Sequence, residues 1–428
     1  MTITKIPKLP IPSPLIGAET GSFTEFTITQ RMPNIARGAI AENSFNLDIN
    51  QKLRNLADTL ESGDIPALVK DEGVDYADWE KYNKPFINKP WIDVPWFFAE
   101  TYFYRLILNI TGYFRPGEFQ GVDPFYSQKQ QGLETSLSSI TSLCLQLNRL
   151  FKQNQRDNSE STFSKETLQS AIARFVYFSL WGNRVDLSLW SALEDSETLD
   201  ESQGSDRSQF DIKHQESYIL VNDVHEVVNL LSEEVCQRVE CITDNSGFEL
   251  ICDLCLMDFL LSSGLVEKVK MHLKPHPTFV SDATIKDVYH TINYLDKTNN
   301  AEILLFTHRL KQHLESKRLV LAEDYFWTSP LAFWEIPDEL KSELAQAKLV
   351  IVKGDANYRR LLGDRHWDFT TNIADILSYL PSPTLALRTL KSEVAAGINP
   401  ETITRVEELD PNWITNGEWG LIELVASL

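Results

Sequence analysis

The sequence predicts an α/β protein in which an N-terminal helical domain precedes a doubly wound, mostly parallel sheet. Three observations support this fold class. The first half of the chain carries apolar residues at helical spacing, the second half alternates short apolar runs with helical patterns, and an acidic, Ser-rich stretch separates the halves. Strands separated by helices are typical of a parallel sheet, because each parallel connection needs a crossover segment.

The chain divides into four segments on composition. Residues 1–30 are rich in Pro and Thr, and we expect an extended arm. A helical domain is expected over 31–191. Residues 192–210 are acidic and Ser-rich, which predicts a surface loop or disordered insertion at a domain boundary. The α/β domain is expected over 211–428.

The first helical segment with a clear signal is residues 96–108, which are apolar nearly all round and therefore predict a buried helix. Asp93 is the expected N-cap, with Pro95 early in the first turn. Two more helices and the polar loop between them are expected at 133–151, 164–180 and 152–163.

Seven short apolar runs in the second half predict strands, at residues 218–221, 238–242, 268–273, 319–321, 349–352, 384–387 and 420–425. Helical patterns lie between them, at residues 226–231, 247–262, 285–297, 301–317 and 337–347. Sheets of this kind bind ligands beyond the carboxyl ends of their strands. The residues that follow each strand are therefore the candidates for chemistry.

Composition excludes several classes of function. The chain has 40 Lys and Arg against 61 Asp and Glu, a formal net charge of −21, which disfavours binding to nucleic acid or an anionic membrane. No apolar run approaches the roughly 18 residues that span a bilayer. Prolines interrupt the N-terminal segment, which argues against a secretory signal. The 5 cysteines indicate no disulfide framework. We expect a cytoplasmic, or also nuclear, protein whose oligomeric state the sequence leaves open.

Oxygen ligands follow two of the predicted strands. Asp244 and Asn245 end the strand at 238–242, and Glu249 lies in the first turn of the next helix. Asp282 follows the strand at 268–273. Each could simply cap a helix. Together Asp244, Asn245 and Asp282 offer three oxygens to one hard cation, which suits Mg²⁺ or Mn²⁺ better than Zn²⁺.

Cationic and glycine-rich segments follow two further strands. After 349–352 come Gly354 and a run that contains Asp355, Ala356, Asn357, Tyr358 and Arg359, where backbone N–H groups before a helix favour an anion. After 384–387 come Arg388, Thr389, Leu390 and Lys391. Each segment could also be an ordinary strand-to-helix turn.

Other motifs are weaker. Cys252 and Cys255 face one side of a helix, where core packing is the better explanation. His272 and His276 lack partners that would complete a zinc site. The sequence contains no GxGxxG, GxxxxGK[ST] or GxSxG motif, which disfavours a nicotinamide enzyme, a P-loop ATPase and a serine hydrolase.

In this order, these segments resemble the metal-dependent damage-control phosphatase family, formerly a domain of unknown function, and its subfamily III, whose mark is an Arg-Thr-x-Lys motif. The resemblance covers nearly the whole chain apart from the acidic insertion. The blocks that carry it are Arg388-Thr389-Leu390-Lys391, Asp244-Asn245 with Gly247-Phe248-Glu249, Val280-Ser281-Asp282, Gly354-Asp355-Ala356-Asn357-Tyr358-Arg359, Trp91-Ile92-Asp93-Val94-Pro95-Trp96 with Glu100 and Tyr104-Arg105, and the segment 181–188 with Asn183 and Asp186.

The resemblance implies a helical domain packed on a Rossmann-like α/β domain, and a divalent metal (Mn²⁺, Ni²⁺, Co²⁺ or Mg²⁺) on Asp244, Asn245 and Asp282. It implies hydrolysis of small phosphometabolites such as fructose 1-phosphate, with fructose 6-phosphate as another candidate. Some members are described as S-adenosylmethionine-dependent carboxyl methyltransferases, in which residues matching Glu249 and Asp282 would touch the methyl donor. No glycine-rich donor loop is present here, so that activity ranks second.

On the phosphatase hypothesis, Asp244 either attacks phosphorus or positions a water, and the sequence does not separate the two. Lys391 and the 355–359 loop would bind phosphate. Asn183 and Asp186 would contact sugar hydroxyls. The alternatives are a methyltransferase acting on protein glutamate and a noncatalytic interaction protein with an acidic loop.

Overall fold

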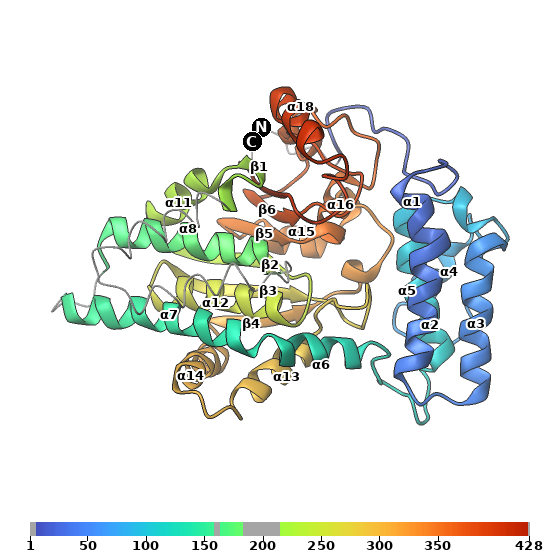
Figure 1. Cartoon of the computed structure of the whole chain (residues 1–428), viewed down its shortest axis with the longest axis horizontal. Helices are drawn as coiled ribbons and strands as arrows, with labels where there is room; N and C mark the ends of the chain where they lie inside the picture. The colour runs from blue at the N-terminus through green and yellow to red at the C-terminus, as the bar shows by residue number, and fades with distance from the viewer. Residues whose placement is uncertain (1–5, 158–162, 183–214, 427–428) are drawn as a thin grey trace.

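The computed structural model describes residues 6–157, 163–182 and 215–426, and these form one seven-stranded sheet with helices around it (Figure 1). The strand order is β1-β7-β6-β5-β2-β3-β4. Neighbouring strands are parallel except for β6 and β7, which are antiparallel. The strands are β1 Ile219–Asn222, β2 Cys236–Ile242, β3 Val266–Leu273, β4 Leu319–Glu323, β5 Leu349–Lys353, β6 Thr384–Thr389 and β7 Gly420–Val425. The predicted fold class is confirmed.

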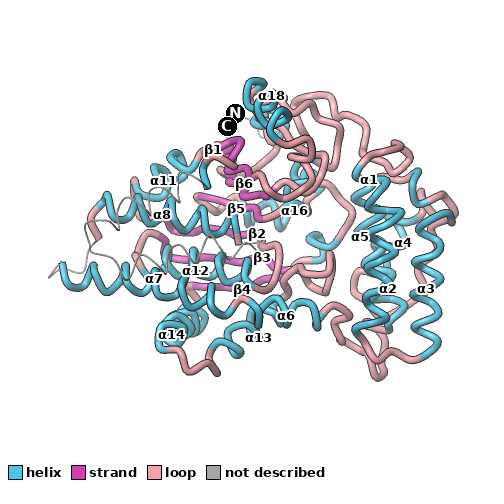
Figure 2. Tube along the Cα trace, in the orientation of Figure 1, coloured by secondary structure: helices cyan, strands magenta, loops and turns pink. Residues whose placement is uncertain are grey.

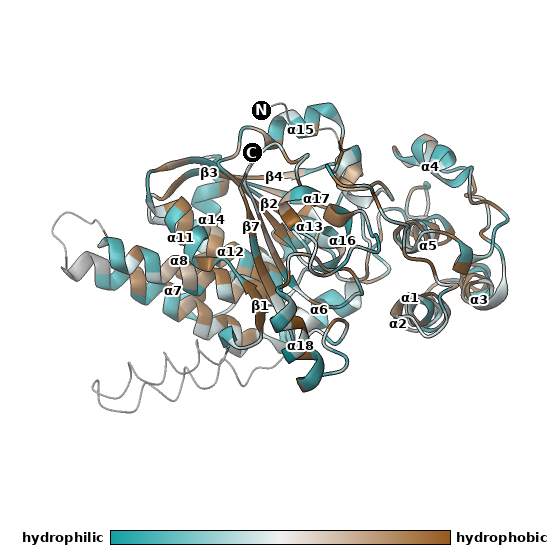
Figure 3. Ribbon diagram, turned by 90° about the horizontal axis from the view of Figure 1, so that it is seen from above, coloured by the Kyte–Doolittle hydropathy of each residue, from teal (hydrophilic) through white to brown (hydrophobic). Residues whose placement is uncertain are grey.

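The middle strands are apolar on both faces because both faces of the sheet are covered. Every residue of β5 and β6 is buried. Figure 2 shows the strands as an inner layer between helices, and Figure 3 shows α7, α8 and α12 on one side of the sheet with α16 and α17 on the other. A continuous apolar run is the expected pattern for such a strand.

The helices of the first half are α1 Phe23–Phe26, α2 Met32–Glu42, α3 Leu47–Ser62, α4 Tyr76–Asn83, α5 Trp96–Thr111, α6 Tyr126–Thr135, α7 Leu137–Asp157 and α8 Lys165–Trp181, with a π-helical turn, η1, at Thr27–Arg31 and a 3₁₀ turn, η2, at Trp91–Asp93. Those of the second half are α11 Val224–Ser232, α12 Phe248–Ser262, α13 Ile285–Leu295, α14 Ala301–Glu315, α15 Asp338–Leu344, α16 Asp355–Leu362, α17 Ile373–Ile376 and α18 Pro400–Leu409, with 3₁₀ turns η4 Tyr325–Thr328 and η5 Phe333–Glu335.

Packing divides the helical domain expected over 31–191. Helices α2, α3 and α5 pack on one another and form a bundle. Helices α7 and α8 instead pack on α11, α12 and α14, and share a core with strands β2 and β3. Helical periodicity identifies the buried face of a helix but not the element that covers it. The expected boundary at 192–210 lies outside the described residues.

Several expected element boundaries need correction. The arm expected over 1–30 is helical from Phe23 onward. The polar loop expected at 152–163 is helical up to Asp157, the last residue of α7. Asp93 lies in η2 and does not cap α5. That role falls to Asp364, whose Oδ2 accepts the Phe97 N–H at 2.9 Å.

The helical bundle covers the carboxyl ends of the strands. Residues that follow β3 and β5 make the contacts: His276 lies 3.5 Å from Asp75, and Arg359 pairs with Glu100 at 2.5 Å. In Figure 1 the bundle, coloured blue, lies at the right-hand end of the sheet. This placement puts the bundle over the edge where a ligand is expected.

All five cysteines are free and buried, and Cys252 and Cys255 belong to the core under the sheet, as predicted. Within the described ranges, no helix combines the length and the apolar character needed to cross a membrane.

Candidate active site

The loops after β2, β3 and β5 meet at one point of the sheet. Asn245 and Asp282 form a backbone bridge, and the Ala283 N–H donates to the Asp244 carbonyl at 2.8 Å. Gly354, with φ of +80°, lies so close that a Cβ on it would be 1.9 Å from Asp244 Oδ2. Only glycine fits there, because any side chain would occupy the space of the carboxylate. The predicted ligands Asp244, Asn245 and Asp282 are therefore brought together.

This point is the place where the strand order reverses. The chain runs from β2 to β3 and β4 on one side, and then returns to β5 on the other side of β2. Loops that leave adjacent strands in opposite directions open a crevice between them, which is where α/β sheets bind ligands.

The Asn245 side chain has a defined orientation. Its Nδ2 donates to Asp244 Oδ2 at 2.7 Å and to Glu249 Oε2 at 2.8 Å. Its Oδ1 accepts the Ser281 hydroxyl at 2.5 Å. Both amide hydrogens are used by carboxylates, so the carbonyl oxygen is left on the opposite side with one lone pair to offer.

The carboxylates at this point are buried and repel one another. Burial raises the pKa of Asp244 well above its usual value, and the charges of Asp282 and Glu249 raise it further. Burial also raises the pKa of Asp282, to about 6, although the nearby Lys274 ammonium lowers it. Lys274 Nζ lies 3.4 Å from Asp282 Oδ2, an atom that accepts no hydrogen bond. The cluster formed by Asp244, Asn245, Glu249 and Asp282 carries more negative charge than the ammonium groups beside it neutralise.

The arrangement fits a divalent cation. Asp244, Asn245 and Asp282 supply hard oxygen donors. A bound cation would reduce the repulsion between the carboxylates and would give Asp282 Oδ2, which accepts no hydrogen bond, a partner. In the described part of the chain, no three His, Cys, Asp or Glu side chains converge as a metal site. A metal here would therefore depend on the amide oxygen of Asn245 and on ligands from outside the chain.

The predicted phosphate loop has mostly internal partners. Asp355 Oδ1 accepts from Arg388 Nε at 2.9 Å, from the Lys391 N–H at 3.1 Å and from the Ser392 hydroxyl at 3.0 Å. Burial raises the pKa of Asp355, but the charges of Arg388 and Arg359 and these hydrogen bonds together lower it below its usual value. Asp355 therefore ties the start of α16 to the segment after β6, while Ala356 beside it is half-buried.

Residues 357–359 also hold the structure together. Asn357 accepts the Lys274 ammonium at 2.9 Å and donates to the Thr243 carbonyl at 3.2 Å. Tyr358 donates to Glu423 at 2.8 Å. Arg359 pairs with Glu100 and Asp364 and lies over Trp96 at 3.4 Å from the ring centroid. The side chains of Tyr358 and Arg359 are thus engaged away from the cluster, unlike what the sequence led us to expect.

In the Arg388–Lys391 segment, three side chains are buried and one is half-exposed. Arg388 is buried against Tyr358 and bonded to the Ser392 and Val394 carbonyls. Leu390 lies in the core, and Thr389 is buried at the end of β6. Lys391 is half-buried, and its Nζ makes no hydrogen bond or ion pair with any residue described.

The other residues that the resemblance brought forward lie in different surroundings. Glu249 belongs to the cluster through its hydrogen bond with Asn245. Glu100 pairs with Arg359. Arg105 forms a buried network with Asp71 and Asp75 at 2.9 Å, within the helical bundle. Asn183 and Asp186 lie outside the described residues.

Three residues around the cluster were given no role from the sequence, although Ser281 stands in a block that carries the resemblance: Lys274, Ser281 and Lys353. Lys274 and Lys353 are at most 2% exposed. Each ends or follows a buried strand. A lysine in that position is the signal that could have found them, because a buried ammonium needs carboxylate partners nearby.

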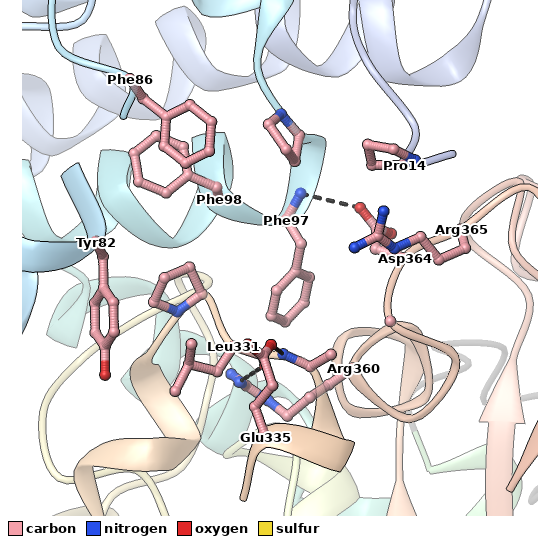
Figure 4. A pocket seen from close by; sticks show the side chains of 14 residues that line it. Pro14, Tyr82, Phe86, Phe97, Phe98, Leu331, Glu335, Arg360, Asp364 and Arg365 are labelled. Carbon is pink, nitrogen blue, oxygen red and sulfur yellow. Dashed lines mark hydrogen bonds between the residues drawn. The ribbon is translucent and has the colours of Figure 1, made fainter. Parts of the chain in front are cut away.

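A separate cavity of about 230 Å³ lies between the helical bundle and the end of α16 (Figure 4). Phe97 and Phe98 line it from α5, and Arg360 and Arg365 from the other side. Arg360 donates to the Leu331 carbonyl at 2.6 Å and to the Ser329 carbonyl at 2.9 Å. None of the predicted site residues lines this cavity.

The fold and the cluster define an α/β protein with a candidate cation site at the reversal of strand order. The chain belongs to the damage-control phosphatase ARMT1-like domain family, whose model matches residues 27–406. That family consists of phosphatases that generally depend on a divalent metal.

Two curated relatives, from Bos taurus and Homo sapiens, agree with this assignment. Over 447 residues the chain is 32% identical to damage-control phosphatase ARMT1 of Bos taurus, covering 96% of this chain and 98% of that protein. The Homo sapiens protein of the same name is 30% identical, with the same two coverages. A crystal structure of a DUF89 family protein from Pyrococcus horikoshii aligns with a TM-score of 0.45 and 13% identity, covering 93% of this chain and 97% of that one.

Proposed function

We propose that this protein is a divalent-metal-dependent phosphatase that hydrolyses small phosphomonoesters, with the cluster of Asp244, Asn245 and Asp282 as its catalytic centre. The observation that carries the proposal is the pair of buried carboxylates and the oriented amide, held at the reversal of strand order with Gly354 directly against Asp244. Membership of a phosphatase family supports the same conclusion.

Each residue is assigned a role that its contacts allow. Asp244, Asn245 and Asp282 would hold a divalent cation, which when bound neutralises charge on the phosphoryl group. Lys391 would bind a phosphoryl oxygen, because its ammonium is unengaged. Asp355 holds the Lys391 backbone in place through its N–H. The backbone at Ala356 and Asn357, at the start of α16, would contribute N–H groups to the anion.

The substrate class follows from charge and from the family. A phosphate dianion is repelled by a chain of net charge −21 unless local cations reverse the field. A compact phosphorylated metabolite suits a site covered by the helical bundle. We propose fructose 1-phosphate as the first substrate to test and fructose 6-phosphate as the second, with Mn²⁺, Ni²⁺, Co²⁺ or Mg²⁺ as the metal.

The test is release of inorganic phosphate from a panel of sugar phosphates, with each metal supplied in turn to metal-stripped protein. We expect release with at least one metal and none with a chelator present. A parallel reaction with S-adenosylmethionine and a protein acceptor tests the methyltransferase alternative. A panel that yields no phosphate with any metal would refute the proposal.

A further inference from the structure

Lys353 is a buried lysine directly behind the candidate cluster. It is the last residue of β5, immediately before Gly354, and is 1% exposed. Its Nζ donates to the Ser179 carbonyl at 2.5 Å and lies 3.3 Å from both Glu249 Oε1 and Asp253 Oδ1. A buried ammonium with two carboxylate partners is held in a single position.

The two oxygens of Glu249 connect Lys353 to Asn245. Oε1 faces the ammonium, and Oε2 accepts the Asn245 amide at 2.8 Å. A carboxylate is an acceptor only, so Glu249 can hold the amino group of Asn245 but not its carbonyl oxygen. The contact of Oε1 with the Lys353 ammonium fixes the position of the Glu249 carboxylate. Lys353 thereby helps to determine that the carbonyl oxygen of Asn245, and not its amino group, faces the position of the cation.

The surroundings of Lys353 leave Glu249 little room to move. Asp253, one turn further along α12, accepts the Ser179 hydroxyl at 2.6 Å and ties α12 to α8. At the end of α8, a Cβ on Gly182 would lie only 3.0 Å from Glu249 Cα. The strand β5 and the two helices therefore enclose the Lys353–Glu249 contact on several sides.

We propose that Lys353 is a positioning residue that acts through Glu249 to present the carbonyl oxygen of Asn245 to a divalent cation. The inference rests on the proposed function, in which Asn245 binds a divalent cation. Metal binding can be measured without any turnover and therefore tests the inference separately. Partners of metal ligands commonly change metal affinity by about 10–100-fold when they are replaced.

The experiment compares Mn²⁺ binding to metal-stripped wild type and Lys353→Met by isothermal titration calorimetry. Methionine keeps much of the length of the side chain and removes the charge. We expect affinity to fall by about 10–100-fold. Where the substrate panel identifies a substrate, turnover of Lys353→Met should recover largely at saturating Mn²⁺. A merely structural role would not give that recovery.

A second variant covers the case in which Lys353→Met does not fold. Glu249→Gln has nearly the same shape, but its amide can donate to Asn245 Oδ1 and so permits the reversed orientation. It should lower Mn²⁺ affinity to a similar extent. If Lys353 acts through Glu249, then adding Lys353→Met to Glu249→Gln should lower affinity by no more than about twofold further.

Asp258→Asn is the matched control. Asp258 lies in the same helix, is fully buried and pairs with Arg309 at 2.8 Å, but contacts none of the cluster. It should bind Mn²⁺ like wild type. The inference is overturned if folded Lys353→Met or Glu249→Gln keeps wild-type affinity, if Asp258→Asn loses affinity equally, or if wild type binds no Mn²⁺. Wild type that binds Mn²⁺ yet hydrolyses nothing would refute the proposed function and leave this comparison valid.

Discussion

Replacing Lys391 with alanine removes the ammonium that we propose binds the phosphoryl group. The contact that holds this residue in place is made by its backbone N–H to Asp355, and alanine keeps it. The Nζ has no hydrogen-bond or ion-pair partner among the residues described, so its removal leaves no buried acceptor unsatisfied. We therefore expect Lys391→Ala to fold normally and to be impaired only in substrate handling.

The magnitude follows from the lost contact. A charge-assisted hydrogen bond is worth about 1.5–3 kcal/mol, which corresponds to roughly a ten- to a hundredfold fall in kcat/KM. Lys391→Arg should restore only part of it. A Cβ on Gly417 would lie 3.2 Å from Lys391 Cε, so the side chain runs in a narrow space where a planar guanidinium fits poorly.

The assay is steady-state phosphate release from the best substrate of the panel at saturating metal. Lys297→Ala is the control, because Lys297 is exposed and its loss changes the net charge by the same amount. Normal kcat/KM in the control would exclude a long-range charge effect. If Lys391→Ala stays within about twofold of wild type, Lys391 is a solvated residue and the phosphate role is wrong.

Three other variants test different parts of the structure. Asp244→Ala should abolish Mn²⁺ binding and turnover. The metal-free variant at pH 8 should melt no lower than wild type, because the change removes the repulsion with Asp282. Titration calorimetry measures the binding, and scanning calorimetry measures the melting temperature. Burial raises the pKa of Glu423 to about 8, so the folded state binds more protons than the unfolded state between about pH 4.5 and 8 and loses stability as the pH rises through that window. Glu423→Gln should flatten this decline in urea unfolding, and an unchanged slope would contradict the shift. Arg105→Ala should cost about 3–5 kcal/mol in urea unfolding, because it removes the guanidinium that pairs with both buried carboxylates, Asp71 and Asp75, yet the folded fraction should keep wild-type kcat/KM.

The strands were predictable because each is a short apolar run between turn residues. All seven predicted runs are strands, and the run at 420–425 has the same bounds as β7. The antiparallel pairing of β7 with β6 was not predictable. Periodicity describes one strand at a time, whereas pairing depends on residues far apart in the chain.

The candidate ligands were predictable for the same physical reason. Carboxyl ends of parallel strands lie at one edge of the sheet, which placed Asp244, Asn245 and Asp282 at that edge, and the pairing of β2 with β3 then brings them together. The partners of Arg359 were not predictable, because Glu100 lies 259 positions earlier in the chain. A cation in a motif can serve a ligand or an ion pair, and only the fold decides between them.

The charges of the cluster give an independent reason to regard it as a functional site. A buried carboxylate destabilises the fold unless it is fully paired. Here Asp244, Asp282 and Glu249 share the cations Lys274 and Lys353, and burial raises the pKa of Asp282 to about 6 although Lys274 lowers it. Stability alone would favour a neutral side chain in place of one of them. A divalent cation supplies the missing positive charge. The lower stability of the metal-free protein and its affinity for metal therefore have the same physical origin.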